Sequence, residues 1–170
     1  MFIVYFDLSG VKNPEKFEEK MQKTKILIVD DNKITLKLIK KYLEGNEFDV
    51  EVASNGEECI SSVNQSHPDI ILLDVMMPKL DGYETIRQLK ANDKTKDIPV
   101  IIVTALNDVT NQVKSIESGA DDFIPKPIEE KLLISKIKLF TQLAVEKRKN
   151  EELRRLLEKA INKGFNPEAE

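Results

Sequence analysis

The stretch Ile70–Gly82, with the sequence IILLDVMMPKLDG, decides the fold of this chain. It opens with four consecutive apolar residues that do not alternate with polar ones, which is typical of a strand buried on both faces of a parallel sheet. The run stops at a carboxylate, Asp74, and Asp81-Gly82 then signals a turn. A carboxylate directly after a buried parallel strand lies where α/β proteins place their chemistry. It could equally be no more than the start of a turn, so the other strands have to decide.

The same strand–helix pattern repeats along the chain. Strands are expected at residues 26–29, 49–53, 70–73, 100–103 and 123–124, and a helix follows each of them. Five such units predict an α/β fold with a doubly wound, five-stranded parallel sheet and helices on both faces. The common strand order for five units is the flavodoxin-like 2-1-3-4-5, whose switch point lies between the first and third strands. Those are the two strands that end in Asp.

Polar side chains follow four of the five strands, and they form the candidate site. They are Asp30, Asp31, Asp74, Thr104 and Lys126. Because the carboxyl ends of parallel strands meet at one rim, we expect these side chains to converge. Three carboxylates in one cleft raise each other's pKa unless a cation neutralises them. Oxygen ligands suit Mg²⁺ better than a soft metal, and the sequence offers no Cys/His cluster for zinc.

A metal-bound carboxylate with a lysine and a threonine beside it is equipped to attack phosphorus. Carboxylate nucleophiles that form an aspartyl-phosphate are an established class, and a metal ion with a lysine would stabilise the charge on the transferring group. We therefore expect phosphoryl chemistry at this rim.

The chain from about Lys25 to Lys138 resembles a receiver domain of the two-component response regulators, chemotaxis-regulator-like in character. Four motifs in order carry the resemblance: VDD after the first strand, LLDVMMPKLDG at the third, VTA at the fourth and FIPKP at the fifth. The resemblance implies that Asp74 accepts a phosphoryl group from a sensor histidine kinase or a histidine phosphotransfer protein. It also implies that Asp31, Asp74 and the backbone carbonyl of Met76 bind Mg²⁺, with Asp30 acting through water.

The resemblance also assigns roles to residues after the fourth and fifth strands. Lys126 would contact the phosphoryl group, Thr104 would move towards it, and Phe123 would be the aromatic residue that reports the change on a nearby surface. Family members usually carry a cis Lys–Pro bond here, which makes Pro127 a candidate. The positions that flank the approach of a hydrolytic water hold Met76 and Leu106, both apolar, so we expect slow self-dephosphorylation.

Several alternatives stand beside this interpretation. Asp30 and Asp31 could be an N-cap pair for the first helix, and Phe123 could be only a core aromatic. Phosphatases of the haloacid-dehalogenase type need a second Asp two residues after the nucleophile as general acid, whereas this chain has Met76 there. We therefore expect a signalling domain that catalyses only its own phosphorylation and dephosphorylation, rather than an enzyme. A degenerate receiver that acts by protein contacts without phosphorylation remains the alternative function.

Composition narrows the class of protein. The chain has 170 residues, 41% of them hydrophobic, with a net charge of −4, which argues against a general nucleic-acid binder, so no direct DNA binding is expected. No apolar stretch is long enough for a membrane span. The single cysteine, Cys59, excludes an intrachain disulfide and fits the reducing cytoplasm, and we expect it to be buried. His67 precedes a proline, so we expect it in a loop rather than on a phosphotransfer helix.

The chain divides into three expected parts. Residues 1–23 are an N-terminal leader of unknown role, with a possible strand at 2–6 and a short helix at 15–22. Residues 24–143 form the receiver domain, and residues 144–170 form a helical extension or linker. The fifth helix is expected to run from about Glu129 to Lys163. One apolar stripe, from Leu133 to Ala144, would pack on the sheet. A second stripe with heptad spacing suggests a homodimer through this helix, although a solvated extension of a monomer is the open alternative.

Overall fold

The computed structural model describes residues 23–46, 48–105, 114 and 117–164. Within them, five strands form one parallel sheet in the order β2-β1-β3-β4-β5, which confirms the predicted doubly wound fold. The strands are β1 (Thr24–Val29), β2 (Phe48–Ala53), β3 (Ile70–Asp74), β4 (Val100–Thr104) and β5 (Asp122–Pro125). Each agrees with its expected position to within two residues.

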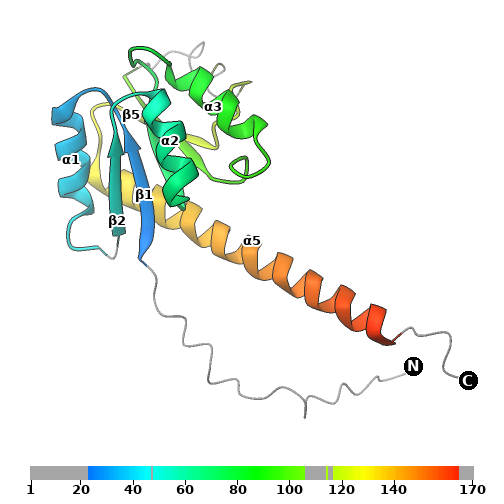
Figure 1. Ribbon diagram of the computed structural model, residues 1–170. Helices are drawn as coiled ribbons and strands as arrows, with labels where there is room; N and C mark the ends of the chain where they lie inside the picture. The colour runs from blue at the N-terminus through cyan, green and yellow to red at the C-terminus, as the bar shows by residue number, and fades with distance from the viewer. Residues whose placement is uncertain (1–22, 47, 106–113, 115–116, 165–170) are drawn as a thin grey trace, which may run out of the picture.

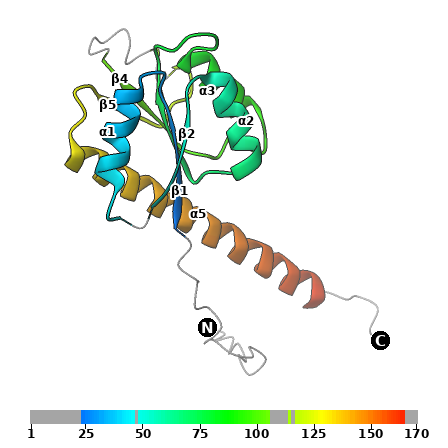
Figure 2. The ribbon, with the colours of Figure 1, turned by 60° about the vertical axis from the view of Figure 1, so that its left-hand side comes forward.

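Helices cover both faces of this sheet. The described helices are α1 (Lys33–Leu43), α2 (Gly56–Ser66), α3 (Gly82–Ala91) and α5 (Glu130–Gly164). α1 and α5 lie on one side of the sheet, and α2 and α3 lie on the other (Figures 1 and 2). Most of the helix expected after the fourth strand, at 109–118, and the elements expected in the leader fall outside the described residues.

The sheet separates two hydrophobic cores. Alternate residues of β1 point to opposite sides: Leu27 packs with α2 and α3, whereas Ile28 packs with α1 and α5. β3 and β4 are buried along their whole length, as expected for central strands covered on both faces. This burial keeps β3 rigid and holds Asp74, its last residue, at a defined position on the rim.

The helix N-termini are capped by polar side chains close to the site. Asn32 caps α1 and accepts hydrogen bonds from the Ile34 and Thr35 amides. The alternative that Asp30 and Asp31 form this cap is therefore wrong, because the Asp30 carboxylate instead accepts a hydrogen bond from the Asn32 amide at 2.8 Å. Both aspartates thus lie before the helix and are available to the site.

Helix α5 has two parts with different surroundings. Leu133 and Ile137 are fully buried against the sheet, and Phe140 packs beside them, which confirms the predicted sheet-packing stripe as far as Phe140. The helix then runs beside two loops of the domain as far as Glu151, and its last turns project past the domain as a single rod (Figures 1 and 2). The extended C-terminal helix expected from the sequence is therefore present, and it begins at Glu130 rather than Glu129.

Candidate functional site

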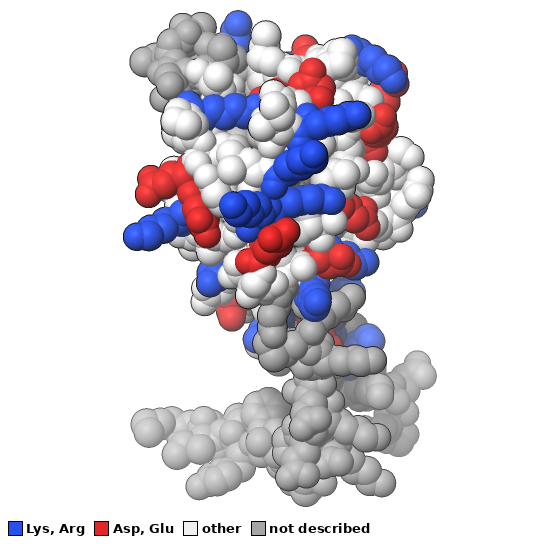
Figure 3. All heavy atoms as spheres, turned by 90° about the vertical axis from the view of Figure 1, so that its left-hand side faces the viewer, with Lys and Arg blue, Asp and Glu red and all other residues white. Residues whose placement is uncertain are grey.

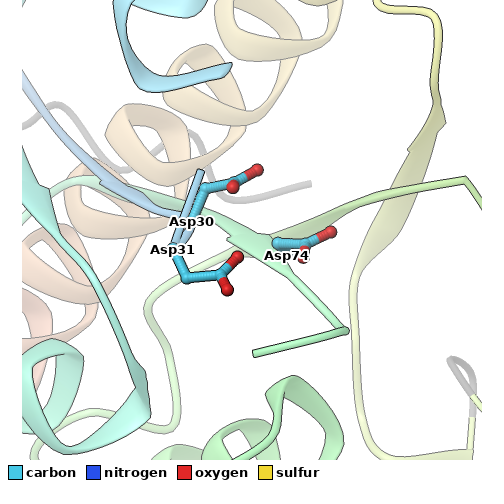
Figure 4. A group of neighbouring side chains, drawn as sticks. All are labelled: Asp30, Asp31 and Asp74. Atoms are coloured by element: carbon cyan, nitrogen blue, oxygen red, sulfur yellow. The ribbon is translucent and has the colours of Figure 1, made fainter. Parts of the chain in front are cut away.

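Three carboxylates converge at the carboxyl ends of β1 and β3. Asp30 and Asp31 directly follow β1, and Asp74 ends β3. These strands are neighbours, with Val29 opposite Leu73, so the two strand ends lie side by side. Figure 4 shows the three side chains around one small space on the rim.

The acidic cluster has the chemistry of a site for a hard divalent cation. One carboxylate oxygen from each of Asp30, Asp31 and Asp74 lies within 4.8 Å of the others. Asp30 and Asp74 are only 2% and 6% exposed, while Asp31 is open to solvent. Carboxylate oxygens at the edge of solvent, with room for water ligands, are what Mg²⁺ requires. The donor set therefore fits the expected magnesium ion.

Lys126 links two of these carboxylates directly. Its ammonium group donates to Asp30 Oδ2 at 2.8 Å and to Asp74 Oδ1 at 3.0 Å. Lys126 lies in the loop immediately after β5, and its side chain reaches the aspartates at the ends of β1 and β3. The sequence predicted that Lys126 would lie at the rim, but not that it would bridge Asp30 and Asp74. The two partners are 96 and 52 residues away along the chain, and no local signal connects them.

Opposing effects set the protonation of this group of side chains. Burial raises the pKa of the Asp74 carboxyl above its ordinary value, the charge of Asp30 adds to the increase, and the ammonium of Lys126 opposes it. Burial alone would lower the pKa of Lys126, but its hydrogen bonds to Asp30 and Asp74 outweigh this and raise it. The lysine therefore stays charged and partly neutralises the cluster.

A glycine at the start of α3 allows the chain to pass close to Asp74. A Cβ on Gly82 would lie 2.4 Å from the Asp74 carbonyl oxygen and 2.7 Å from Val75 Cα. The Gly82 amide also donates to the Val75 carbonyl at 3.0 Å. Asp81 caps α3 through the Glu84 amide. Asp81-Gly82 was predicted as a turn, but the pair begins a helix, and the glycine is required by the close approach of two backbone segments.

Thr104 and Phe123 lie on the neighbouring strands. Thr104 ends β4 and is buried, and its carbonyl accepts a hydrogen bond from the Lys126 amide at 2.8 Å. Phe123 lies in β5 and is 37% exposed, so it is not a residue of the core. The Lys126–Pro127 peptide bond is cis, as expected.

Two reactive residues lie away from the site. His67 is exposed and is the C-cap of α2, with φ of 47°, so it lies on no helix face, as expected. Cys59 is fully buried, and burial raises the pKa of its thiol to about 12. Leu106, expected beside the site, falls outside the described residues.

The comparison with known families identifies the chain. The family model of the response regulator receiver domain matches residues 26–138. The chain belongs to the response regulator receiver domains. The chain is 42% identical over 115 residues to a transcriptional regulatory protein, a CpxR homolog, from Haemophilus influenzae, a match that covers 68% of this chain and 49% of the relative. The chain spans half or less of the length of the curated relatives it matches.

Solved structures agree with this assignment. The signal receiver domain of a signal transduction histidine kinase from Syntrophus aciditrophicus is 39% identical with a TM-score of 0.66, and the match covers 70% of this chain and 90% of that one. The receiver domain of a sensor histidine kinase from Pseudomonas aeruginosa is 25% identical, also with a TM-score of 0.66, over 70% of this chain and 98% of that one. A magnesium ion is coordinated in the active-site cleft of the Pseudomonas structure.

Receiver domains of this family are signalling domains of two-component systems. Among the described residues of this receiver, no helix is both long enough and apolar enough to cross a membrane.

Proposed function

We propose that this receiver accepts a phosphoryl group on Asp74 from a histidine kinase or a histidine phosphotransfer protein and signals through a phosphorylation-dependent surface change. The observation that carries the proposal is the position of the Asp74 carboxylate. It ends a fully buried strand, beside two further carboxylates, and it is held by the ammonium of Lys126. A merely structural aspartate would not need this concentration of charge on an open rim.

The transfer is a substitution at phosphorus. An oxygen of the Asp74 carboxylate forms a bond to the phosphorus of the donor phosphohistidine as the P–N bond breaks, and the electron pair of that bond returns to the imidazole. Lys126 lies 3.0 Å from Asp74 Oδ1, so it would hold this carboxylate in place and then donate to the transferred phosphoryl oxygens. Thr104, at the end of β4, would add a hydroxyl on the other side.

We propose that Asp31 and Asp74, with the backbone carbonyl of Met76, hold Mg²⁺, and that Asp30 acts mainly through water. The exposure of Asp31 and the burial of Asp30 agree with this division. When bound, the cation would offset the repulsion between the carboxylates and an incoming dianionic phosphoryl group. Asp30 is already hydrogen-bonded to Lys126 and to the Asn32 amide, which suits an indirect role.

The donor protein would meet a cationic surface beside the site. α1 begins three residues after Asp30 and carries four lysines and no acidic residue. Figure 3 shows Lys and Arg side chains gathered on the face of the molecule that bears α1. Ile34, on the same helix, is 78% exposed. Such a surface attracts an acidic partner and speeds its association in a salt-dependent way.

We further propose that residues 24–143 act as the receiver and residues 144–170 as an extension, with Phe123 and Thr104 as the residues that report phosphorylation. Phe123 is partly exposed on β5, next to the strand that ends in Thr104, so a shift at Thr104 could reach the surface. The free, buried Cys59 agrees with a reducing cytoplasm. A receiver that acts by contacts alone is the alternative.

Intact-mass spectrometry after incubation with acetyl phosphate and Mg²⁺ tests the proposal. One phosphoryl group is expected on the wild-type chain and none on Asp74→Asn. Asp31→Asn retains Asp74 but should be labelled little, and added Mg²⁺ should not increase its labelling. Equal labelling of wild type and Asp74→Asn would refute the acceptor assignment, and no labelling of either protein would favour the contact-only receiver. Decay of the label should be slow and should accelerate in Met76→Asn.

A further inference from the structure

Helix α5 presents a row of exposed leucines that begins at Leu139 and ends at Leu157. Leu139, Leu143, Leu153 and Leu157 are 52%, 55%, 56% and 51% exposed. A leucine whose only neighbours belong to its own helix leaves apolar surface in water, and exposed leucines that recur on one face of a helix mark an interaction surface. Two polar residues, Glu146 and Asn150, divide this row into two pairs of leucines. This row lies on the solvent side of the molecule, so no described part of the chain covers it.

The spacing of these residues is that of a two-stranded coiled coil. In a heptad abcdefg, Leu139 and Leu153 take position d, and Leu143 and Leu157 take position a. Asn150, also exposed, takes the a position between the last two. An asparagine at one a position is best satisfied when it meets the same asparagine of a second helix. The row is therefore complementary to itself.

The domain leaves this row free. The side of the helix that faces the domain carries Ala144, Lys147 and Glu151. These residues line a cavity of about 250 Å³ together with the α2–β3 and α3–β4 loops. Lys147 also forms an ion pair with Asp97 of the α3–β4 loop. At 3.6 residues per turn, this domain-facing stripe is about 110° around the helix from the leucine row. The leucine row therefore does not face the two loops, and Lys147, at position e, borders it on one side.

Lys136 occupies the a position before Leu139, and its charge is neutralised by a residue of the domain. Lys136 would place a charge in the row, but its ammonium is engaged by Asp122 of β5. Pairing would thus begin at Leu139 and continue outward along the rod. Glu146, at a d position, weakens the centre of the row, so we expect moderate rather than tight association.

We infer that the occupant of this surface is a second copy of the chain, paired in parallel and in register along α5 from Leu139, with Asn150 facing Asn150 of the second copy. In an antiparallel pair, each Asn150 would face a d residue and lose its partner. Parallel pairing places both receiver domains at the same end of the rod. This inference concerns the unphosphorylated chain and does not depend on whether Asp74 accepts a phosphoryl group.

Sedimentation of the full chain without phosphodonor tests the surface. At tens of micromolar a dimer is expected, and Leu143→Glu/Leu157→Glu should be monomeric, with unchanged unfolding of the domain. Val145→Glu is the matched control, because Val145 is 40% exposed on the same helix but lies off the leucine row. A monomeric wild type, or a dimer that survives the double substitution, would overturn the inference.

Disulfide cross-linking tests the orientation. Leu139→Cys should form a cross-linked dimer under mild oxidation, because the two copies of position 139 adjoin only in the parallel, in-register pair. Val145→Cys should not, and the native Cys59 is buried. A dimer in which Leu139→Cys fails to cross-link would contradict parallel pairing.

A charge substitution provides a gain-of-affinity test. In the parallel register Lys149 lies across from Arg154 of the second copy, so two exposed cations repel each other on each side of the pair. Lys149→Glu converts this repulsion into attraction and should tighten association about two- to fivefold. Weaker or unchanged association of Lys149→Glu would count against this register.

Discussion

The two halves of α5 show how one continuous helix can serve two purposes. In its first half, Leu133 and Ile137 are fully buried against the sheet. In its second half, Leu153 and Leu157 have the same chemistry and are more than half exposed. The backbone is helical throughout, so the difference comes only from what lies beside each side chain. Helix formation and burial are thus separate properties in this molecule.

The charged groups of the two regions differ in the same way. At the site, Lys126 pairs with aspartates that are almost fully buried. In the second half of α5, Lys147 pairs with Asp97, and both side chains are more than half exposed. A charge withdrawn from water depends on its partner far more than one that water can solvate. The stability of the domain should therefore depend on the first pair and barely on the second.

The largest expected effect separates the two halves of the helix. Leu133→Ala should lower the free energy of unfolding by about 3 kcal/mol, because it removes buried methyl groups and leaves a cavity between α5 and the sheet. Leu156→Ala, at a site that is 55% exposed, should change it by less than about 0.5 kcal/mol. Urea denaturation followed by circular dichroism, at submicromolar protein, measures both. Similar losses in the two variants would erase the distinction between the halves.

A smaller effect separates the two kinds of ion pair. Lys126→Met should destabilise the Mg²⁺-free domain by about 2 kcal/mol, because it leaves two buried carboxylates without their cation. Added Mg²⁺ should recover part of that loss. Lys147→Met should cost less than about 1 kcal/mol, since its pair is exposed. The comparison fails if Lys147→Met proves the more damaging substitution in matched urea titrations.

The next effect is a pH-dependent gain in the stability of Asp74→Asn relative to wild type. Burial raises the pKa of Asp74, so the folded chain holds this proton to a higher pH than the unfolded chain does. Stability is therefore lost as the pH rises through the folded pKa of Asp74. In EDTA at neutral pH, Asp74→Asn should be more stable than wild type, and the difference should vanish below about pH 3.9, the ordinary pKa of aspartate. Addition of Mg²⁺ should stabilise only the wild type appreciably.

The smallest expected effect concerns Cys59. Its thiol is fully buried, with a pKa raised to about 12, so almost no thiolate exists at neutral pH. A thiol reagent should label it only in the unfolded chain, and the rate in native conditions should follow the rate of unfolding. Rapid labelling of the folded protein would show that α2 opens locally.

The sequence by itself determined the sheet, its strand order and the residues of the rim. Short apolar runs that end in Asp30 and Asp74 are local patterns, and parallel topology then places their ends together. It also determined that α5 would be long and that one of its stripes would face the sheet, because helical periodicity is carried by neighbouring residues.

Only the tertiary structure decided how those residues are joined. Lys126 reaches Asp30 and Asp74 across the sheet, and Gly82 is required because α3 starts against the Asp74 backbone. Each of these contacts joins residues or backbone segments whose approach depends on the packing of whole elements, and no local pattern records that packing.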